Sequence, residues 1–194
     1  MAARDALIEG VIDLIRRNGV AGTGVAELLT HSGISRRSIY LNFPGGKSQL
    51  VAEATRVAGG GMSQLIEKAT SGGQTPQNTL DQLSGWWRRF LTASDFVAGC
   101  PIVAAALGRS ESPEAADAAA EAISHWIDLL SSHLVERNVA PDVARSLAIT
   151  VVSALEGAVI VSQATGSTEP IDATSKHLTE LLDKYLLSAE APAY

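Results

Sequence analysis

Residues 33–43 carry the densest group of side chains that could bind an anion. The segment reads GISRRSIYLNF and places two arginines, Arg36 and Arg37, next to hydroxyl and amide side chains. Cations and hydroxyls bind phosphate oxygens, and an arginine can also donate two hydrogen bonds to a guanine edge. These residue types favour contact with a nucleic acid through Ser35, Arg36, Arg37, Ser38, Tyr40 and Asn42.

A short helix is expected to present these side chains. Ser35 follows Gly33 and can cap the helix, because its side-chain oxygen can accept a backbone N–H of the first turn. Ile34, Ile39 and Phe43 are apolar and are left to be buried. Another short apolar-patterned segment, residues 25–29, precedes the glycine. Two short helices joined by a tight glycine-containing turn predict a helix-turn-helix, whose second helix reads the major groove.

Landmark residues recur over residues 7–50 in the pattern of a known family. They are Gly19, Thr23, Val25, Leu28, residues 33–35, Ile39, Tyr40, Phe43 and residues 47–50. This segment resembles the DNA-binding domain of the TetR (tetracycline-repressor) family of transcriptional regulators. The strings FPGGK at 43–47 and GCP at 99–101 resemble one subgroup, the LmrA/YxaF-like regulators. The sequence departs from the family pattern at Gly24, Leu29 and Ser32, where a small hydroxyl residue and two alanines are usual.

The resemblance implies an all-α fold of about nine helices. A three-helix DNA-binding domain would occupy residues 1–46, and a helical effector-binding and dimerisation domain residues 47–194. The resemblance also makes Thr23 and Lys47, with Tyr40, contacts to the DNA backbone. It implies a pocket in the body that takes lipophilic or aromatic compounds.

Composition favours the same fold class independently. Hydrophobic residues make up 46% of the 194 residues but aromatic residues only 5%, so the core must be mostly Ala, Leu, Val and Ile. No run is expected to approach the ~20 apolar residues that span a bilayer. Early charges at Arg4, Asp5 and Glu9 interrupt any signal-peptide core. A single cysteine excludes an internal disulfide, so we expect a cytoplasmic protein without a membrane partner.

The net charge of −6 is unevenly distributed. Residues 1–56 hold 7 Lys and Arg against 5 Asp and Glu, whereas the remainder holds 8 against 16. The cations therefore concentrate where the helix-turn-helix is expected, and an acidic body would help to orient that end towards DNA.

Apolar stripes, glycines and prolines predict the helix boundaries. The expected helices are about 4–17, 23–32 with Thr23 as N-cap, 35–43, from 47 onwards, 76–92, 101–107, 113–138, from 141 onwards, and after 170. Three glycines, residues 59–61, are expected to interrupt the fourth helix, since each costs roughly 1 kcal/mol relative to alanine. They indicate either a kink or close packing of a neighbouring helix, or a soft joint between the two domains.

Catalytic and metal-binding patterns are missing from the sequence. The four histidines form no i, i+4 pair, and no His-Glu-x-x-His, Cys-x-x-Cys or Gly-x-Ser-x-Gly string occurs. We therefore expect no enzyme activity, no metal and no cofactor. Cys100 has two interpretations, a small buried apolar residue or a redox sensor at a helix start before Pro101.

Aromatic residues of the body have two interpretations as well. Their default role is core packing, and the alternative is to stack a planar effector. Glu156, in the otherwise apolar eighth helix, could pair with a ligand donor or with a neighbouring Arg or His. The candidate ligand-binding residues are Trp86, Trp87, Phe90, Phe96, Ile123, Trp126, Leu130, Leu155 and Glu156.

The eighth helix is apolar over most of its circumference, so it must be covered on all sides. It could be the central core helix of a monomer, or it could meet a partner. The family resemblance implies that the eighth and ninth helices pair with their twofold copies as a four-helix bundle. The expected dimer residues are Ala158, Ile160, Val161, Leu178, Leu181, Leu182 and Tyr185.

Together these features predict a homodimeric repressor. It would bind a palindromic operator in double-stranded DNA and be released by a small lipophilic or aromatic effector. An alternative keeps DNA binding but replaces the effector by a redox signal at Cys100 or by a protein partner. An all-helical enzyme or adaptor without DNA binding is a third class, which a clustered acid, base or metal set would favour.

Overall fold

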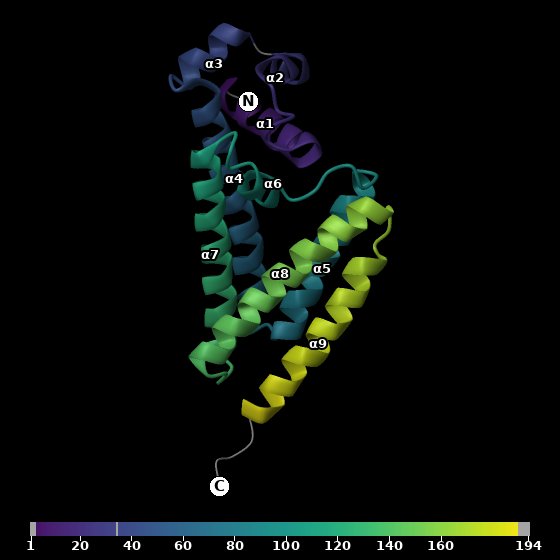
Figure 1. Cartoon of the computed structure of the whole chain (residues 1–194). Helices are drawn as coiled ribbons and strands as arrows, with labels where there is room; N and C mark the ends of the chain where they lie inside the picture. Colours follow the sequence, from purple (N-terminus) through teal and green to yellow (C-terminus); the bar gives the residue numbers. More distant parts are fainter. Residues whose placement is uncertain (1–2, 34, 190–194) are drawn as a thin grey trace. The chain divides into compact units, whose positions relative to one another are not determined.

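The computed structural model describes residues 3–33 and 35–189. Within those residues the chain forms nine α-helices and no strand, which confirms the predicted all-α fold (Figure 1). The helices are α1 (Ala3–Asn18), α2 (Val25–Ser32), α3 (Arg36–Asn42), α4 (Gly46–Thr70), α5 (Pro76–Ala93), α6 (Pro101–Leu107), α7 (Pro113–Val135), α8 (Pro141–Thr165) and α9 (Glu169–Ala189).

The chain divides into two compact units. The N-terminal unit contains Met1–Gly61 and Val97–Ile123, and the C-terminal unit contains Met62–Phe96 and Ser124–Tyr194. Each unit is thus built from two separate stretches of sequence, and α4 and α7 each contribute to both. The functional boundary predicted after residue 46 stays a prediction.

The core of the N-terminal unit forms around one face of α1. Leu7, Val11 and Ile15 are spaced by four residues, so they share a helix face, and each is at most 1% exposed. Burying each such side chain contributes about 1.5–3 kcal/mol. Phe43 is fully buried at the end of α3. The guanidinium of Arg4 lies 5.4 Å from the centroid of the Phe43 ring, which fastens the end of α3 to α1.

Helix α6 belongs to the N-terminal unit although it is distant in sequence. It packs against α1, and just before it the backbone N–H of Gly99 donates to the carbonyl of Arg16 at 2.9 Å. After α6, a Cβ added to Gly108 would lie 2.8 Å from Cβ of Val20, so only glycine allows this approach. The three helices of the helix-turn-helix therefore share their core with a segment about 80 residues downstream.

Helix α4 runs without a break through the three glycines, so the predicted interruption is wrong. A Cβ added to Gly59 would lie 2.7 Å from Cβ of Ala122 on α7, whereas additions to Gly60 and Gly61 would meet nothing within 4 Å. Close packing, one of the two predicted roles, therefore applies to Gly59 alone. Packing of this kind offsets the low helix propensity of the glycines.

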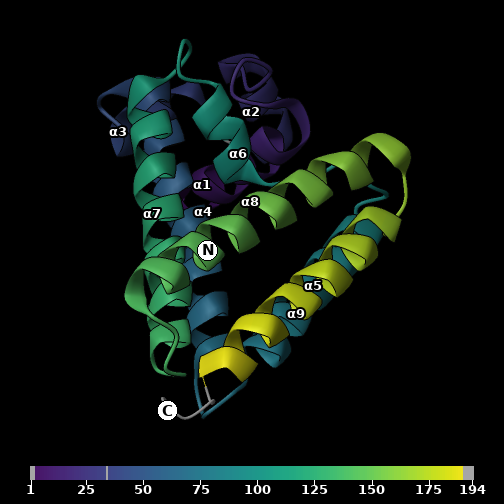
Figure 2. The same cartoon turned by 60° about the horizontal axis from the view of Figure 1, so that its bottom comes forward.

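Three helices form the centre of the C-terminal unit. Helix α5 packs against α8 and α9, and α8 and α9 pack against each other (Figures 1 and 2). Leu80 and Leu91 of α5 and Ile171 of α9 are almost completely buried. Thr75 caps α5 by accepting a hydrogen bond from the Asn78 N–H, and Pro76 follows in the first turn, where its missing N–H costs nothing.

Two predicted helix ends are wrong. Helix α2 starts at Val25 with Gly24 as its N-cap, not Thr23. Helix α7 ends at Val135, short of the predicted residue 138, and Asn138 takes a left-handed conformation with φ of 63°. The latter is a common way for an asparagine to turn the chain.

Helix α8 is long and apolar enough to cross a membrane by length and composition, with a mean hydropathy of 1.7. The expectation that no segment approaches this limit is therefore wrong. The same test is passed by a core helix of a soluble protein, and α8 buries Leu147, Val151, Leu155 and Val159 inside its own chain. Ile149, Ile160 and Val161 of the same helix are 43–50% exposed.

Candidate functional site

Helix α3 is held at its start by a side-chain cap, as predicted. The hydroxyl oxygen of Ser35 accepts a hydrogen bond from the backbone N–H of Ser38 at 3.3 Å. The preceding turn uses Gly33 in the left-handed conformation, with φ of 65°. This turn and cap define where α2 ends and where α3 begins.

Two apolar anchors fix which face of α3 is turned outwards. Ile39 is 1% exposed and Phe43 is fully buried, and Phe43 follows Ile39 by four positions, so they share one side. Ile34, the third residue expected to be buried, lies outside the described residues. Arg36 and Arg37 are both exposed. In the part of the chain that the structure describes, neither guanidinium forms an ion pair or a hydrogen bond with another residue, so both can contact an external anion.

Three of the predicted contacts also serve the helix itself. The hydroxyl groups of Ser35 and Ser38 lie 3.1 Å apart, and the side-chain amide of Asn42 donates to the Ser38 carbonyl at 2.8 Å. Ser38 and Asn42 are half-buried. These groups stabilise the short helix, and their remaining acceptor atoms stay available for a ligand.

Tyr40 and Lys47 lie on the two sides of the turn between α3 and α4. Tyr40 is 53% exposed, and an atom added to Gly46 at the Cβ position would lie 3.3 Å from Cε1 of its ring. Gly46 has φ of 68° and begins α4, so the ring rests on a position that only glycine fits. Lys47 follows and is half-buried. The side-chain oxygen of Gln49 accepts the Gly45 N–H at 2.9 Å and stabilises the turn.

Thr23 lies apart from the other predicted contacts. It is 2% exposed, and its hydroxyl donates to the Gly19 carbonyl at 2.7 Å. The hydroxyl thus closes the turn between α1 and α2 instead of capping α2.

Two further side chains near α3 were missed by sequence reasoning. Leu41 is 70% exposed although it is one of the apolar residues of the helix. Glu114, at the start of α7, accepts a 2.6 Å hydrogen bond from the Ser48 hydroxyl on α4, and this bond lowers the pKa of the Glu114 carboxyl. A helical wheel built on the buried Ile39 would have found Leu41; no local signal identifies Glu114.

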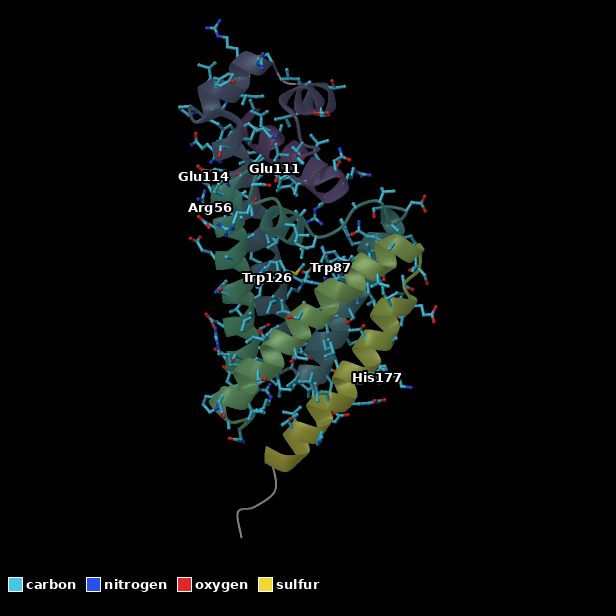
Figure 3. The ribbon with its side chains drawn as sticks, viewed as in Figure 1. Arg56, Trp87, Glu111, Glu114, Trp126 and His177 are labelled. Carbon is cyan, nitrogen blue, oxygen red and sulfur yellow. The ribbon has the colours of Figure 1, made fainter. Side chains whose placement is uncertain are left out.

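A small cavity in the C-terminal unit collects five of the nine predicted ligand-binding residues. Its volume is about 30 Å³, and Figure 3 marks two of its residues, Trp87 on α5 and Trp126 on α7. The predicted residues that line it are Trp87, Trp126, Leu130, Leu155 and Glu156, and the residues missed are Met62, Ile66, Leu83, Val151 and Val152. Glu156 is the one ionisable group in this lining.

The other four predicted ligand-binding residues do not line this cavity. Trp86 stacks on Phe90 with ring centroids 5.3 Å apart, and it meets Trp87 edge to face at 4.8 Å. Phe96 has a φ of 59° in the turn after α5, and Ile123 belongs to the N-terminal unit. The Trp86–Phe90 pair therefore supports the cavity wall through Trp87.

A second cavity of about 20 Å³ is bordered by His133 of α7 and by apolar residues of α5 and α8. His133 is 3% exposed, and its Nε2 lies 3.3 Å from the hydroxyl of Thr79. Burial lowers the pKa of the His133 imidazole, and the nearby positive charge of Arg137 lowers it further. The imidazole is therefore neutral at pH 7 and acts as a packed polar residue of the core.

The described residues contain no group of three or more His, Cys, Asp or Glu side chains placed to hold a metal ion. Cys100 is 7% exposed at the N-cap position of α6.

Comparison with known proteins places both halves of the chain in one group. Residues 7–54 match the model of "Bacterial regulatory proteins, tetR family", and residues 76–177 match "Transcriptional regulator LmrA/YxaF-like, C-terminal domain". An "Uncharacterized HTH-type transcriptional regulator" of Mycobacterium tuberculosis is 33% identical over 92% of this chain and 93% of its own length. The HTH-type transcriptional regulator LmrA of Bacillus subtilis is 25% identical over 94% of this chain and 97% of its own.

Solved structures agree on the fold. A regulatory protein TetR from Rhodobacter sphaeroides has a TM-score of 0.82 at 17% identity, covering 91% of this chain and 96% of that one. A TetR family transcriptional regulator from Agrobacterium tumefaciens has a TM-score of 0.80 at 21% identity, covering 94% and 96%.

Proposed function

Because the chain belongs to the TetR family, whose members are transcriptional regulators with a helix-turn-helix and not enzymes, we propose that it is a ligand-responsive repressor. In this proposal a homodimer binds a palindromic operator through two copies of α3. A small lipophilic or aromatic effector enters the cavity lined by Trp87 and Trp126 and releases the DNA. The repressor acts in the cytoplasm.

The observation that carries the proposal is the outward face of α3. Arg36 and Arg37 are exposed on a helix that is capped by Ser35 and anchored by Ile39 and Phe43. Exposed arginines on a rigid, short helix suit guanine edges and phosphates in a major groove. Tyr40 and Lys47 are placed to contact the backbone beside the groove. We leave Thr23 out of the interface, because its hydroxyl is buried and bonded to Gly19.

The effector site rests on the composition of the cavity wall. Two indole rings, aliphatic side chains and the Met62 thioether suit an apolar or planar molecule, and the Glu156 carboxylate suits a donor or a positive charge on it. The cavity of about 30 Å³ is far smaller than the roughly 300 Å³ of a typical ligand pocket. Binding must therefore move helices apart, and a ligand that prefers the widened state shifts the population of conformations.

Dimerisation is supported by the exposed apolar side chains of α8. Ile160 and Val161 are about half exposed, and Leu181 and Tyr185 on α9 are partly exposed. Ala158, Leu178 and Leu182 are buried within the chain itself, so the proposed interface depends on the first four residues. A single reading helix covers only a few base pairs, and two are needed for operator-grade affinity.

The alternative signal, oxidation of Cys100, fits the structure less well. The thiol is 7% exposed and surrounded by the core of the N-terminal unit, and reactive thiols are usually accessible. A protein partner in place of an effector would leave the cavity without a role.

The experiment that tests the proposal combines DNA selection with a ligand screen. Sequences are selected from a random duplex pool with the purified protein, and affinity is measured at several salt concentrations. We expect a palindromic consensus and an affinity that falls steeply with salt. A thermal-shift ligand screen, repeated on the protein–DNA complex, should find compounds that stabilise the free protein and lower its DNA affinity. Binding of DNA without any sequence preference would contradict the repressor assignment.

A further inference from the structure

Leu41 is the most unusual residue of the reading helix. It is 70% exposed, whereas the other apolar aliphatic residue of α3, Ile39, is 1% exposed. Single exposed leucines are common on protein surfaces. This leucine, however, lies on the helix that the proposed function turns towards DNA, so its chemistry bears on which bases that helix can read.

Helix geometry places Leu41 on the outward side of α3, opposite Ile39, near the C-terminal end of the helix. Two residues along a helix correspond to a rotation of about 200°, so Leu41 points away from the buried Ile39. Arg37 is four residues earlier and therefore shares the face with Leu41. Arg37 is exposed as well, so the two side chains form the outermost row of α3.

The major groove offers one apolar group to such a side chain. Thymine carries a C5-methyl group there, while the other base edges present hydrogen-bond donors and acceptors. Phosphates and sugars next to the groove give a leucine little apolar surface to bury.

We propose that Leu41 determines part of the operator sequence by packing against the methyl group of a thymine. This inference rests on the proposed function and names the base that one residue of the interface selects. The Arg37 guanidinium reads a neighbouring guanine. Four residues rise about 6 Å along a helix and base pairs are stacked about 3.4 Å apart, so the guanine and the thymine lie roughly two base pairs apart.

Deoxyuridine provides the test, because uracil differs from thymine only by the missing C5-methyl group. An operator is first selected with the wild-type protein, and each thymine is then replaced by deoxyuridine at both symmetric positions of the palindrome. Affinity for every duplex is measured with the wild type, Leu41→Ala and Leu41→Ile. Arg37→Ala serves as the matched control on the same face of α3.

At one thymine position in each half-site, replacement by deoxyuridine should lower the affinity of the wild type. Burying a methyl group is worth about 0.8 kcal/mol, which is roughly a fourfold change in affinity per half-site. With both half-sites changed, the wild type should lose about fifteenfold. Leu41→Ala should bind the thymine and uracil duplexes with equal affinity. Leu41→Ile and Arg37→Ala should still bind the thymine duplex more tightly than the uracil duplex. The exposure of Leu41 means that its replacement should leave the melting temperature nearly unchanged.

Three negative results are possible: two overturn the assignment of Leu41, and the third overturns the proposed function. If no thymine shows a methyl effect that disappears in Leu41→Ala, the assignment of Leu41 is overturned, although the protein still binds its operator. If Leu41→Ala binds every duplex as the wild type does, the assignment is overturned as well, and the side chain has another partner. If no operator can be selected with the wild type, the proposed function itself fails.

Discussion

At the scale of single residues, α3 separates into side chains that hold the helix and exposed side chains that are proposed to read DNA. Ser35, Ile39 and Phe43 fix the helix by a cap and by burial. Arg36 and Arg37 project from it with no ion pair to a described residue, so their charge is available to a ligand. Because of this separation, we expect that Arg36 and Arg37 can be replaced without loss of the fold.

Replacing Arg37 by alanine should cost about 1–3 kcal/mol of operator affinity if the guanidinium reads a base. The loss should be confined to one base position, where the preference for guanine relaxes. A selection experiment with the variant measures this directly. The Arg36→Ala/Arg37→Ala double variant is the stricter test. Unchanged operator affinity in that variant would refute the DNA-reading role of α3.

Replacing Lys47 by alanine should weaken binding to all sequences alike, because a phosphate contact carries no sequence information. The slope of log affinity against log salt should decrease in magnitude by about one, since one fewer counterion is released. Fluorescence anisotropy with operator and random duplexes at four salt concentrations measures both effects. A loss restricted to the operator would instead show that Lys47 reads a base.

His133 should make stability depend on pH. Burial lowers the pKa of its imidazole in the folded protein, while the unfolded chain takes up a proton near the ordinary value of 6.5. The unfolded state therefore binds more protons as the pH falls below 6.5, and the free energy of unfolding decreases until the pH passes the lower folded pKa.

His133→Gln should flatten this decrease by up to about 1.4 kcal/mol per pH unit, the maximum for one proton. Urea unfolding between pH 7.5 and pH 5 gives the measurement. His177→Gln is the matched control for replacing a histidine outside the core, since the His177 side chain is 74% exposed. Identical slopes for the wild type and His133→Gln would contradict the assignment.

At the scale of helices, features that depend on neighbouring residues could be predicted from the sequence, whereas contacts between distant segments could not. The Ser35 cap follows from a pattern of neighbouring residues, and the nine helices follow from apolar spacing and from prolines at helix starts. The Thr23 cap failed because a threonine hydroxyl can equally bond backwards, here to Gly19. Leu41 was overlooked because a short helix with several apolar residues does not reveal which of them is buried.

The residues that line the cavity were likewise only partly predictable from the sequence. Trp87 and Trp126 were both predicted, because bulky aromatic side chains commonly line ligand pockets. Nothing in the sequence distinguished Met62 and Ile66 of α4 from other apolar helix residues. Trp86 is adjacent to Trp87 in sequence but points elsewhere and stacks on Phe90. Only the packing of separate helices decides which side chain of a neighbouring pair faces the cavity.

The glycines of α4 should respond differently to alanine. Gly60→Ala and Gly61→Ala should each stabilise the protein by about 1 kcal/mol, because an added Cβ meets nothing within 4 Å and alanine favours the helix. Gly59→Ala should destabilise it by about 1–3 kcal/mol, because the new Cβ would lie 2.7 Å from Ala122.

Thermal and urea unfolding of the three variants provide the comparison. A combined Gly60→Ala/Gly61→Ala variant also tests the soft-joint hypothesis. If these glycines act as a joint, the variant should bind the effector as tightly as the wild type does, but the effector should release the operator from it less effectively. Release at the same effector concentration as in the wild type would exclude that role for these two glycines.

At the scale of the whole molecule, assembly should control DNA affinity. Ile160→Asp places a charge in an apolar surface that the proposed dimer buries, so it should split the dimer and abolish operator binding while the monomer stays folded. Sedimentation velocity at micromolar concentration measures the oligomeric state. Leu107→Asp is the control, since Leu107 is also an apolar residue and is 80% exposed on α6. A wild-type protein that sediments as a monomer would refute the dimer.

The return of α6 to α1 also limits how such a protein can be recombined. A fragment that ends after Gly61 keeps all three helices of the helix-turn-helix but loses the Gly99–Arg16 hydrogen bond and the chain that covers Val20. Chimeras that exchange DNA specificity between relatives should therefore fold best when residues 97–123 are transferred together with the first 61. The proposed DNA-contacting helix α3 and the segment that supports α1 are thus separated in the sequence but belong to one compact unit, so a crossover between residues 61 and 97 would combine α3 with a supporting segment from another protein.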